Sequence, residues 1–144
     1  MPGDAVAEIL NPYADEQPET KQITLRARSG QEVSADFTLQ DRRGRKSAAE
    51  YLFHLYSTIR EKMNEPTLEA AAPSPDDQGA MRRMILYVAG AHDTLFGTFN
   101  ARSEMPEEER NEFVEIFLLA CATVLEGRRI TVDLQQGNIL AEAD

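Results

Sequence analysis

The sequence has little that would support catalysis through a cysteine, a histidine or a bound metal. It contains one cysteine and two histidines among 144 residues. A single cysteine cannot form an intramolecular disulfide, which favours a reducing compartment. One thiol and two imidazoles also make no complete catalytic triad, zinc-ligand set or redox motif. We therefore expect a protein that is not an enzyme and that binds no cofactor or metal.

Long apolar segments are also missing. The longest apolar run, residues 116–125 interrupted only by Thr123, is half as long as the roughly 20 residues that cross a bilayer. The first residues, MPGD, carry no cationic region followed by an apolar run, as a secretory signal would. The sequence thus predicts no membrane contact and a cytoplasmic location.

Positive charge is scarce and unevenly distributed. Fifteen Lys and Arg stand against 25 Asp and Glu, giving a net charge of −10. Nucleic-acid binding without sequence preference needs an extended cationic surface, which this balance disfavours. Four cations nevertheless fall within the stretch DRRGRKS, which we call the basic segment: Arg42, Arg43, Arg45 and Lys46. Removing those four charges leaves −14, so a partner protein with basic segments fits better than nucleic acid.

The length and composition are those of one globular domain. Forty-two per cent of the residues are apolar and 28 per cent are charged, which is typical of a folded chain of this size. We expect a flexible N-terminal arm over residues 1–20, a single folded domain over 21–135, and an acidic C-terminal tail over 136–144.

Alternating apolar and polar residues predict a β-hairpin near the N-terminus. Ile23, Leu25 and Ala27 alternate with polar residues, and the same period returns over residues 33–39. Residues that face each other in an antiparallel pair must lie on one side of the sheet. A three-residue loop, Ser29-Gly30-Gln31, satisfies this rule. It pairs Ala27 with Val33, Leu25 with Ala35, Ile23 with Phe37 and Arg28 with Glu32.

Three helical patterns follow the hairpin. Ser47 and Glu50 match a capping box, so the first helix is expected to begin there, with the basic segment in the loop before it. Ser74 as N-cap predicts the start of the second, whose apolar stripe runs from Met81 to Phe99 and reaches about Asn100. The third opens near Pro106, stops at Gly127 and is apolar nearly all round, so it should be the central helix.

The pattern after the third helix completes the predicted fold. Ile130, Val132 and Leu134 alternate with polar residues and indicate a strand that joins the hairpin. The fold class is therefore α+β: a β-hairpin plus a C-terminal strand in one small sheet packed against three α-helices, in the order β-β-α-α-α-β. The predicted core consists of Ile23, Leu25, Val33, Phe37, Leu52, Leu55, Ile59, Ile85, Val88, Leu95, Phe113, Phe117 and Val124.

The basic segment is the first candidate site. Gly44 to Ser47 superficially match the end of a phosphate-binding loop, but Leu39 stands where the earlier glycine would be, and no lysine follows Gly44 directly. Two interpretations remain. Arg42, Arg43, Arg45 and Lys46 contact an anion or an acidic partner segment, or they form a solvated loop beside the acidic surface of the protein.

Two further candidates lie in the second helical pattern. His92 falls on the apolar stripe, so it is either a core histidine with one satisfied hydrogen bond or part of a pocket with Tyr56 and Tyr87. Gly90 and Gly97 share another face with Leu86 and Asp93. Glycines inside a helix suggest either the close approach of another helix, within the domain or from a second subunit, or a helix that ends near Gly97.

These observations give three functional hypotheses. The first is a non-catalytic protein-binding module, of adaptor, secretion or assembly chaperone, or inhibitor type, that uses an apolar helical face and an acidic surface and that could form a homodimer. The second is a small-ligand or enzymatic pocket around His92. The third is a nucleic-acid-associated accessory protein that uses residues 42–46.

Overall fold

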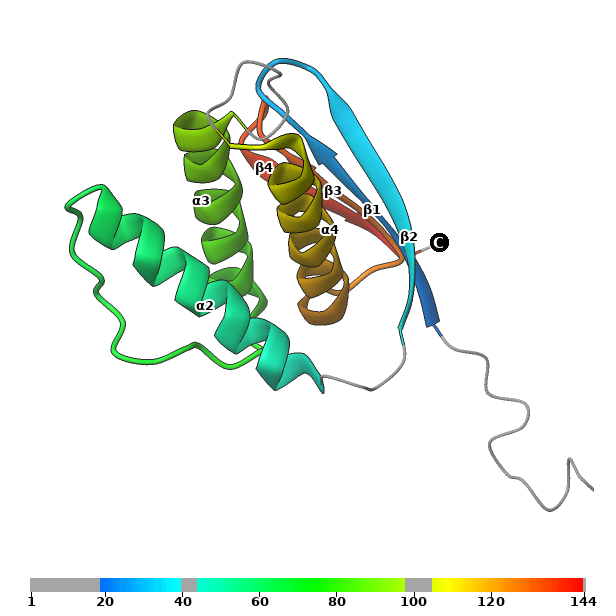
Figure 1. Cartoon of the computed structure of the whole chain (residues 1–144). Helices are drawn as coiled ribbons and strands as arrows, with labels where there is room; N and C mark the ends of the chain where they lie inside the picture. The colour runs from blue at the N-terminus through cyan, green and yellow to red at the C-terminus, as the bar shows by residue number, and fades with distance from the viewer. Residues whose placement is uncertain (1–18, 40–43, 98–104, 144) are drawn as a thin grey trace, which may run out of the picture.

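The computed structural model describes residues 19–39, 44–97 and 105–143. A four-stranded mixed sheet, in the order β2-β1-β3-β4, is covered on one face by two of the three helices, and the third packs on those two (Figure 1). This confirms the predicted α+β class. The elements in chain order are β1 (Glu19–Arg26), β2 (Glu32–Leu39), α2 (Gly44–Lys62), α3 (Gln78–Phe96), α4 (Glu107–Val124), β3 (Arg129–Asp133) and β4 (Asn138–Glu142).

Strand β4 lies where an acidic tail was predicted. It pairs antiparallel with β3, and Ile139, opposite Val132, is buried. The turn before it is set by Asp133, whose Oδ1 accepts the backbone N–H groups of Gln135 and Gln136 at 2.9 and 3.1 Å. The tail prediction failed because β4 buries so few apolar side chains that no alternation is visible. At the other end, β1 begins at Glu19, inside the expected arm, whose residues 1–18 lie outside the described residues.

The predicted hairpin exists, but its register is shifted by two residues. Leu25 pairs with Val33 and Ile23 with Ala35. The reason is the position of Gly30, which has a φ of 94°. Its N–H donates to Ala27 O at 3.0 Å, and the Ala27 N–H donates to Gln31 O at 2.8 Å. This is the three-residue loop that ends in a glycine bulge, so the glycine takes the last loop position and not the middle one.

The core lies between the sheet and the helices, and α4 is its central helix as predicted. Phe117, Cys121 and Val124 of α4 are fully buried in one cluster with Ile23 of β1 and Ile130 of β3. β1 and β3 run parallel, and all three helices lie between them in the chain. Most of the predicted core is buried or partly buried. The exception is Leu95, which is 44 % exposed at the end of α3.

Two helix starts differ from the predictions. Helix α2 begins at Gly44, three residues before the expected cap Ser47, so Arg45 and Lys46 belong to its first turn. Helix α3 begins at Gln78 because Asp77, rather than Ser74, caps it, and the Asp77 side chain accepts from Ala80 N at 3.1 Å.

Helix α3 also ends earlier than expected. Its last residue is Phe96, and Gly97 follows with a φ of 56° and donates its N–H to Asp93 O at 3.0 Å. A glycine in this left-handed conformation is a common end of a helix. Phe99 and Asn100, which the prediction included, lie outside the described residues.

The helices cover different parts of the sheet. Helix α4 contacts β1 and β2, whereas α3 contacts β4, to which Arg82 Nη1 donates a hydrogen bond at Ile139 O (3.0 Å). Helix α2 packs across both α3 and α4 (Figure 1). The flank of α4 that faces away from α3 therefore lies above the β2 edge of the sheet.

Candidate functional site

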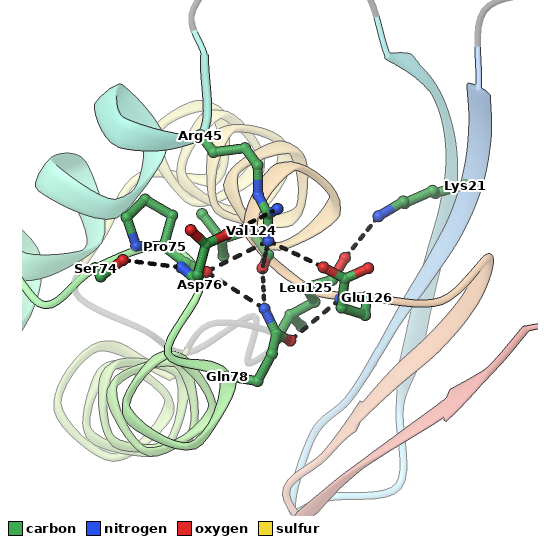
Figure 2. Close-up of polar contacts among 9 residues, drawn as sticks. All are labelled: Lys21, Arg45, Ser74, Pro75, Asp76, Gln78, Val124, Leu125 and Glu126. Carbon is green, nitrogen blue, oxygen red and sulfur yellow. Dashed lines mark hydrogen bonds and ion pairs between the residues drawn. The ribbon is translucent and has the colours of Figure 1, made fainter.

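Arg45 of the basic segment is held at the C-terminal end of α4. Its Nη2 donates to Val124 O at 3.3 Å and to Glu126 Oε1 at 3.1 Å, and Nη1 lies 3.3 Å from Asp76 Oδ1. Figure 2 shows the guanidinium among these oxygens, between the start of α2 and the loop before α3. The last carbonyls of a helix carry partial negative charge, so a cation there is stabilising. Arg45 is unfavourable for its own helix but favourable for α4.

Two other side chains bind the same helix end. Gln78 Nε2 donates to Val124 O at 2.7 Å, and its Oε1 accepts from Glu126 N at 3.2 Å. Lys21 of β1, which is buried, donates from Nζ to Leu125 O at 2.6 Å. Burial lowers the pKa of Lys21, while the nearby carboxylates of Glu19 and Glu126 oppose that shift. Residues from β1, α2 and α3 thus converge on the end of α4.

This arrangement changes the meaning of the basic segment. Arg45 faces two carboxylates and the end of a helix, so it adds no unpaired charge to a cationic surface. Lys46 is exposed, and Arg42 and Arg43 lie outside the described residues. The prediction of an anion or partner contact at these four positions stays a prediction, and Arg45 already has acidic partners within the chain.

The predicted pocket residues fall into two places. Tyr56 of α2 and Tyr87 of α3 meet edge to face with centroids 5.2 Å apart, and both line a cavity of about 400 Å³ beneath the α2–α3 connection. Their hydroxyls donate to Glu69 (3.4 Å) and Glu65 (3.0 Å). Burial and the hydrogen bond to Glu65 raise the pKa of Tyr87. His92 is not among the residues that line this cavity.

His92 packs among aromatic rings. Its imidazole stacks on Phe113 with centroids 3.6 Å apart and planes at 6°, and Phe96 lies 4.7 Å away. Only 5 % of the residue is exposed. Burial lowers the pKa of His92 to about 4, and the positive charge of Lys62 acts in the same direction. At neutral pH His92 is therefore an uncharged part of the core. This agrees with the interpretation of His92 as a core histidine.

The glycine face of α3 is covered by a turn and not by a helix. Arg28, in the β1–β2 turn, donates from Nη1 to Gly90 O at 2.8 Å, and its Nη1 lies 3.9 Å from Asp93 Oδ2. A Cβ at Gly90 would lie 2.9 Å from Arg28 Nη2. Gly97 serves as the end of the helix, while Leu86 is partly buried. Within the described residues, the candidate interface of Leu86, Gly90, Asp93 and Gly97 is thus occupied near Gly90 by the chain's own arginine.

Cys121 should not react with thiol reagents in the folded protein. It is fully buried in α4, and burial raises the pKa of its thiol above the usual range. Because the thiolate is the reactive form and the sulfur is out of reach of solvent, we expect no labelling by iodoacetamide under native conditions and complete labelling in urea. Rapid native labelling, detected by intact mass, would contradict the packing of α4 described above.

Among the residues that the structure describes, no group of three or more His, Cys, Asp or Glu side chains is placed to hold a metal ion. The helices in the same residues include none with the length and apolar character that a membrane crossing requires.

Strand β2 forms one edge of the sheet, a surface that the sequence did not single out. Hydrogen-bonded and non-hydrogen-bonded pairs alternate along an antiparallel ladder. Ala27 and Gln31 form a hydrogen-bonded pair, so the N–H and C=O groups of β2 that point away from β1 belong to Glu32, Ser34, Asp36 and Thr38. No strand in the described part of the chain pairs with this side of β2.

Helix α4 exposes an acidic stripe beside this edge. The sheet, α3 and α2 surround α4 on three sides, and its remaining flank carries the exposed residues Glu108, Glu112 and Glu115 together with the partly exposed Ile116 and Leu119. Glu112 lies at the α2 border of this flank, because burial and the charge of Glu112 raise the pKa of Tyr51 in α2. The apolar helical face on which the first functional hypothesis rests is therefore mostly buried in α4. We call this stripe and the outer edge of β2 together the β2–α4 surface.

Comparison with known proteins adds no relative. No family model matches the chain, and neither a curated protein nor a solved structure shows significant similarity to it.

Proposed function

We propose that this chain is a non-catalytic protein-binding module, of adaptor, chaperone or inhibitor type, that binds basic segments of another protein at the β2–α4 surface. The observation that carries the proposal is the exposed stripe of Glu108, Glu112 and Glu115 next to a strand edge that the rest of the described chain leaves unpaired. Interfaces of this kind combine a partly apolar centre with charged residues around it.

The charge of the protein supports the same partner chemistry. The chain carries −10 overall, and Arg45 is already matched by Asp76 and Glu126. An acidic surface of this kind speeds the encounter with a basic partner and disfavours acidic ones. Ile116 and Leu119 between the glutamates supply the apolar contact that a purely electrostatic surface lacks.

Reversing the charge of the α4 stripe should weaken the binding of a basic probe. The probe is a fluorescent seven-residue peptide, Lys-Val-Lys-Val-Lys-Val-Lys, followed by anisotropy at low ionic strength. In the double variant Glu112→Lys with Glu115→Lys, the peptide should bind at least about tenfold more weakly, because two attractive charges become repulsive. Added salt should weaken wild-type binding in the same experiment.

A matched control separates this surface from overall charge. The double variant Glu61→Lys with Glu142→Lys makes the same change in net charge at exposed glutamates of α2 and β4, away from the β2–α4 surface, so peptide binding should stay close to wild type. Equal losses in this control and in the α4 variant would show that only net charge matters. A wild-type protein that does not bind the peptide at all would overturn the proposed function.

A further inference from the structure

We infer that the β2–α4 surface binds its partner by strand addition: an extended segment with alternating basic and apolar residues pairs with the outer edge of β2 and extends the sheet. This inference rests on the proposed function and adds the conformation and sequence pattern of the bound segment.

The outer edge of β2 is long and regular, and it lacks several features that usually protect an edge strand. It is eight residues long, and its register with β1 runs without a bulge from Glu32 to Leu39. Natural proteins usually protect an edge strand with a bulge, a proline or a lysine, or by keeping it short. Strand β2 contains no proline or lysine. Its outward N–H and C=O groups at Ser34 and Asp36 are therefore placed to pair with an incoming strand.

The two faces of β2 define which side chains an added strand would need. Val33, Ala35, Phe37 and Leu39 point to the helix side and are only partly buried. The opposite face carries exposed polar residues, with Glu32 and Asp36 as the acids. Side chains alternate between faces along a strand. An added strand would thus place apolar side chains next to Phe37 and Ala35, and basic ones near Glu32 and Asp36.

The negative charge of this chain favours a basic segment over a second copy of the chain as the partner of the β2 edge. Pairing of β2 with another β2 would bring two acidic stripes of α4 to the same interface, and each chain carries −10. Like charges that face each other across a ladder or an interface are destabilising. A segment with lysine or arginine at every second residue instead places all its cations on the face that carries Glu32 and Asp36, and the acidic stripe of α4 adds only long-range attraction.

The first test compares two peptides of equal composition. Lys-Val-Lys-Val-Lys-Val-Lys has the required period of two, whereas Lys-Lys-Lys-Lys-Val-Val-Val has the same charge without it. Strand addition predicts that the alternating peptide binds at least about tenfold more tightly. If both bind equally and with the same salt dependence, the acidic surface binds basic peptides but strand addition is wrong. If neither binds, the proposed function fails as well.

The second test uses N-methylation to detect the added ladder. Methyl groups on the backbone nitrogens of residues 1, 3, 5 and 7 of the alternating peptide, or of residues 2, 4 and 6, remove donors on one or the other side of a strand. One of the two peptides should lose binding and the other should retain it. Equal behaviour of the two would overturn strand addition.

A proline in β2 provides the reciprocal test on the protein. Asp36→Pro removes an N–H that points away from β1, so the β1–β2 ladder keeps its bonds, and proline is tolerated at such edge positions. Binding should fall at least about tenfold relative to Asp36→Ala, which removes the same charge but keeps the N–H. Circular dichroism establishes that both variants fold. If the folded proline variant binds the alternating peptide as the alanine variant does, the edge is not used.

Size-exclusion chromatography with light scattering tests whether a second copy of this chain pairs with the outer edge of β2. Strand addition by a partner predicts a monomer in which the β2 edge is open. A dimer that Asp36→Pro dissociates would assign the edge to self-association and overturn the inference.

Discussion

Replacing Asp133 with alanine should lower the free energy of unfolding by about 3 kcal/mol, one of the two largest effects that we expect. Asp133 is 1 % exposed, and its Oδ2 lies 2.6 Å from Arg26 Nη1. Its Oδ1 accepts the backbone N–H groups of Gln135 and Gln136. The substitution removes the acceptor of Arg26 Nη1 and of two backbone N–H groups, and it loosens both β1–β3 and the turn into β4. Urea denaturation measures the loss.

The second ion pair of Arg26, which it makes with Glu32, provides the control for the Asp133 variant. Arg26 Nε also contacts Glu32 Oε1 at 2.6 Å, but the Glu32 side chain is 48 % exposed. Exposed ion pairs contribute little, so Glu32→Ala should cost no more than about 1 kcal/mol. The variant Asp133→Asn should fall between the two, because an amide oxygen can still accept in the turn but carries no charge. Equal losses for Asp133→Ala and Glu32→Ala would contradict the importance of burial here.

Acidification should destabilise the fold through His92. Its pKa is about 4 in the folded protein, below the ordinary value of 6.5. A depressed histidine pKa means that the unfolded chain binds the proton more tightly. The contribution of His92 to stability is therefore complete above pH 6.5 and declines as the pH falls toward 4. The total loss is about 3 kcal/mol, from the shift between the two values.

The measurement compares variants, because many carboxylates titrate in the same range. His92→Phe retains an aromatic ring next to Phe113 but cannot take up a proton. Between pH 7.5 and 4.5, wild type should lose about 2–3 kcal/mol more unfolding free energy than this variant. The control is His54→Gln, which removes an imidazole that is exposed on α2 and lies outside the core. If His92→Phe follows the wild-type curve, the imidazole does not cause the acid sensitivity.

The hairpin illustrates what the sequence could and could not determine. The alternation of apolar and polar residues predicted correctly that the side chains of Ile23 and Leu25 face the core, because a strand has a side-chain period of two. The register was wrong by two residues, a shift that leaves every side chain on its predicted face. The side of the sheet on which each side chain lies therefore cannot distinguish the two registers. The conformation of Gly30 does, because the bulge needs a positive φ at the last loop position.

The candidate surface was harder to predict than the fold. The acidic stripe of α4 follows from helical period, but its neighbour β2 depends on strand order, which no local pattern specifies. The position of β1 between β2 and β3 is what leaves β2 at the edge. Likewise, the partners of Arg45 come from the loop before α3 and from the residues that follow α4. The local charge pattern indicated that the basic segment could lie beside the acidic surface of the protein, but it could not identify the oxygen atoms that Arg45 contacts.

The parallel pairing of β1 with β3 has a consequence for synthesis and folding. Arg26 and Asp133 are neighbours in the sheet but 107 positions apart in the chain. A two-stranded hairpin is at best marginally stable by itself, so Ile23 and Leu25 stay uncovered while all three helices are being made. The closure of so large a loop is slow. We therefore expect the sheet to form late, only after residues up to Asp133 have left the ribosome, with the β1–β2 hairpin exposed to aggregation until then.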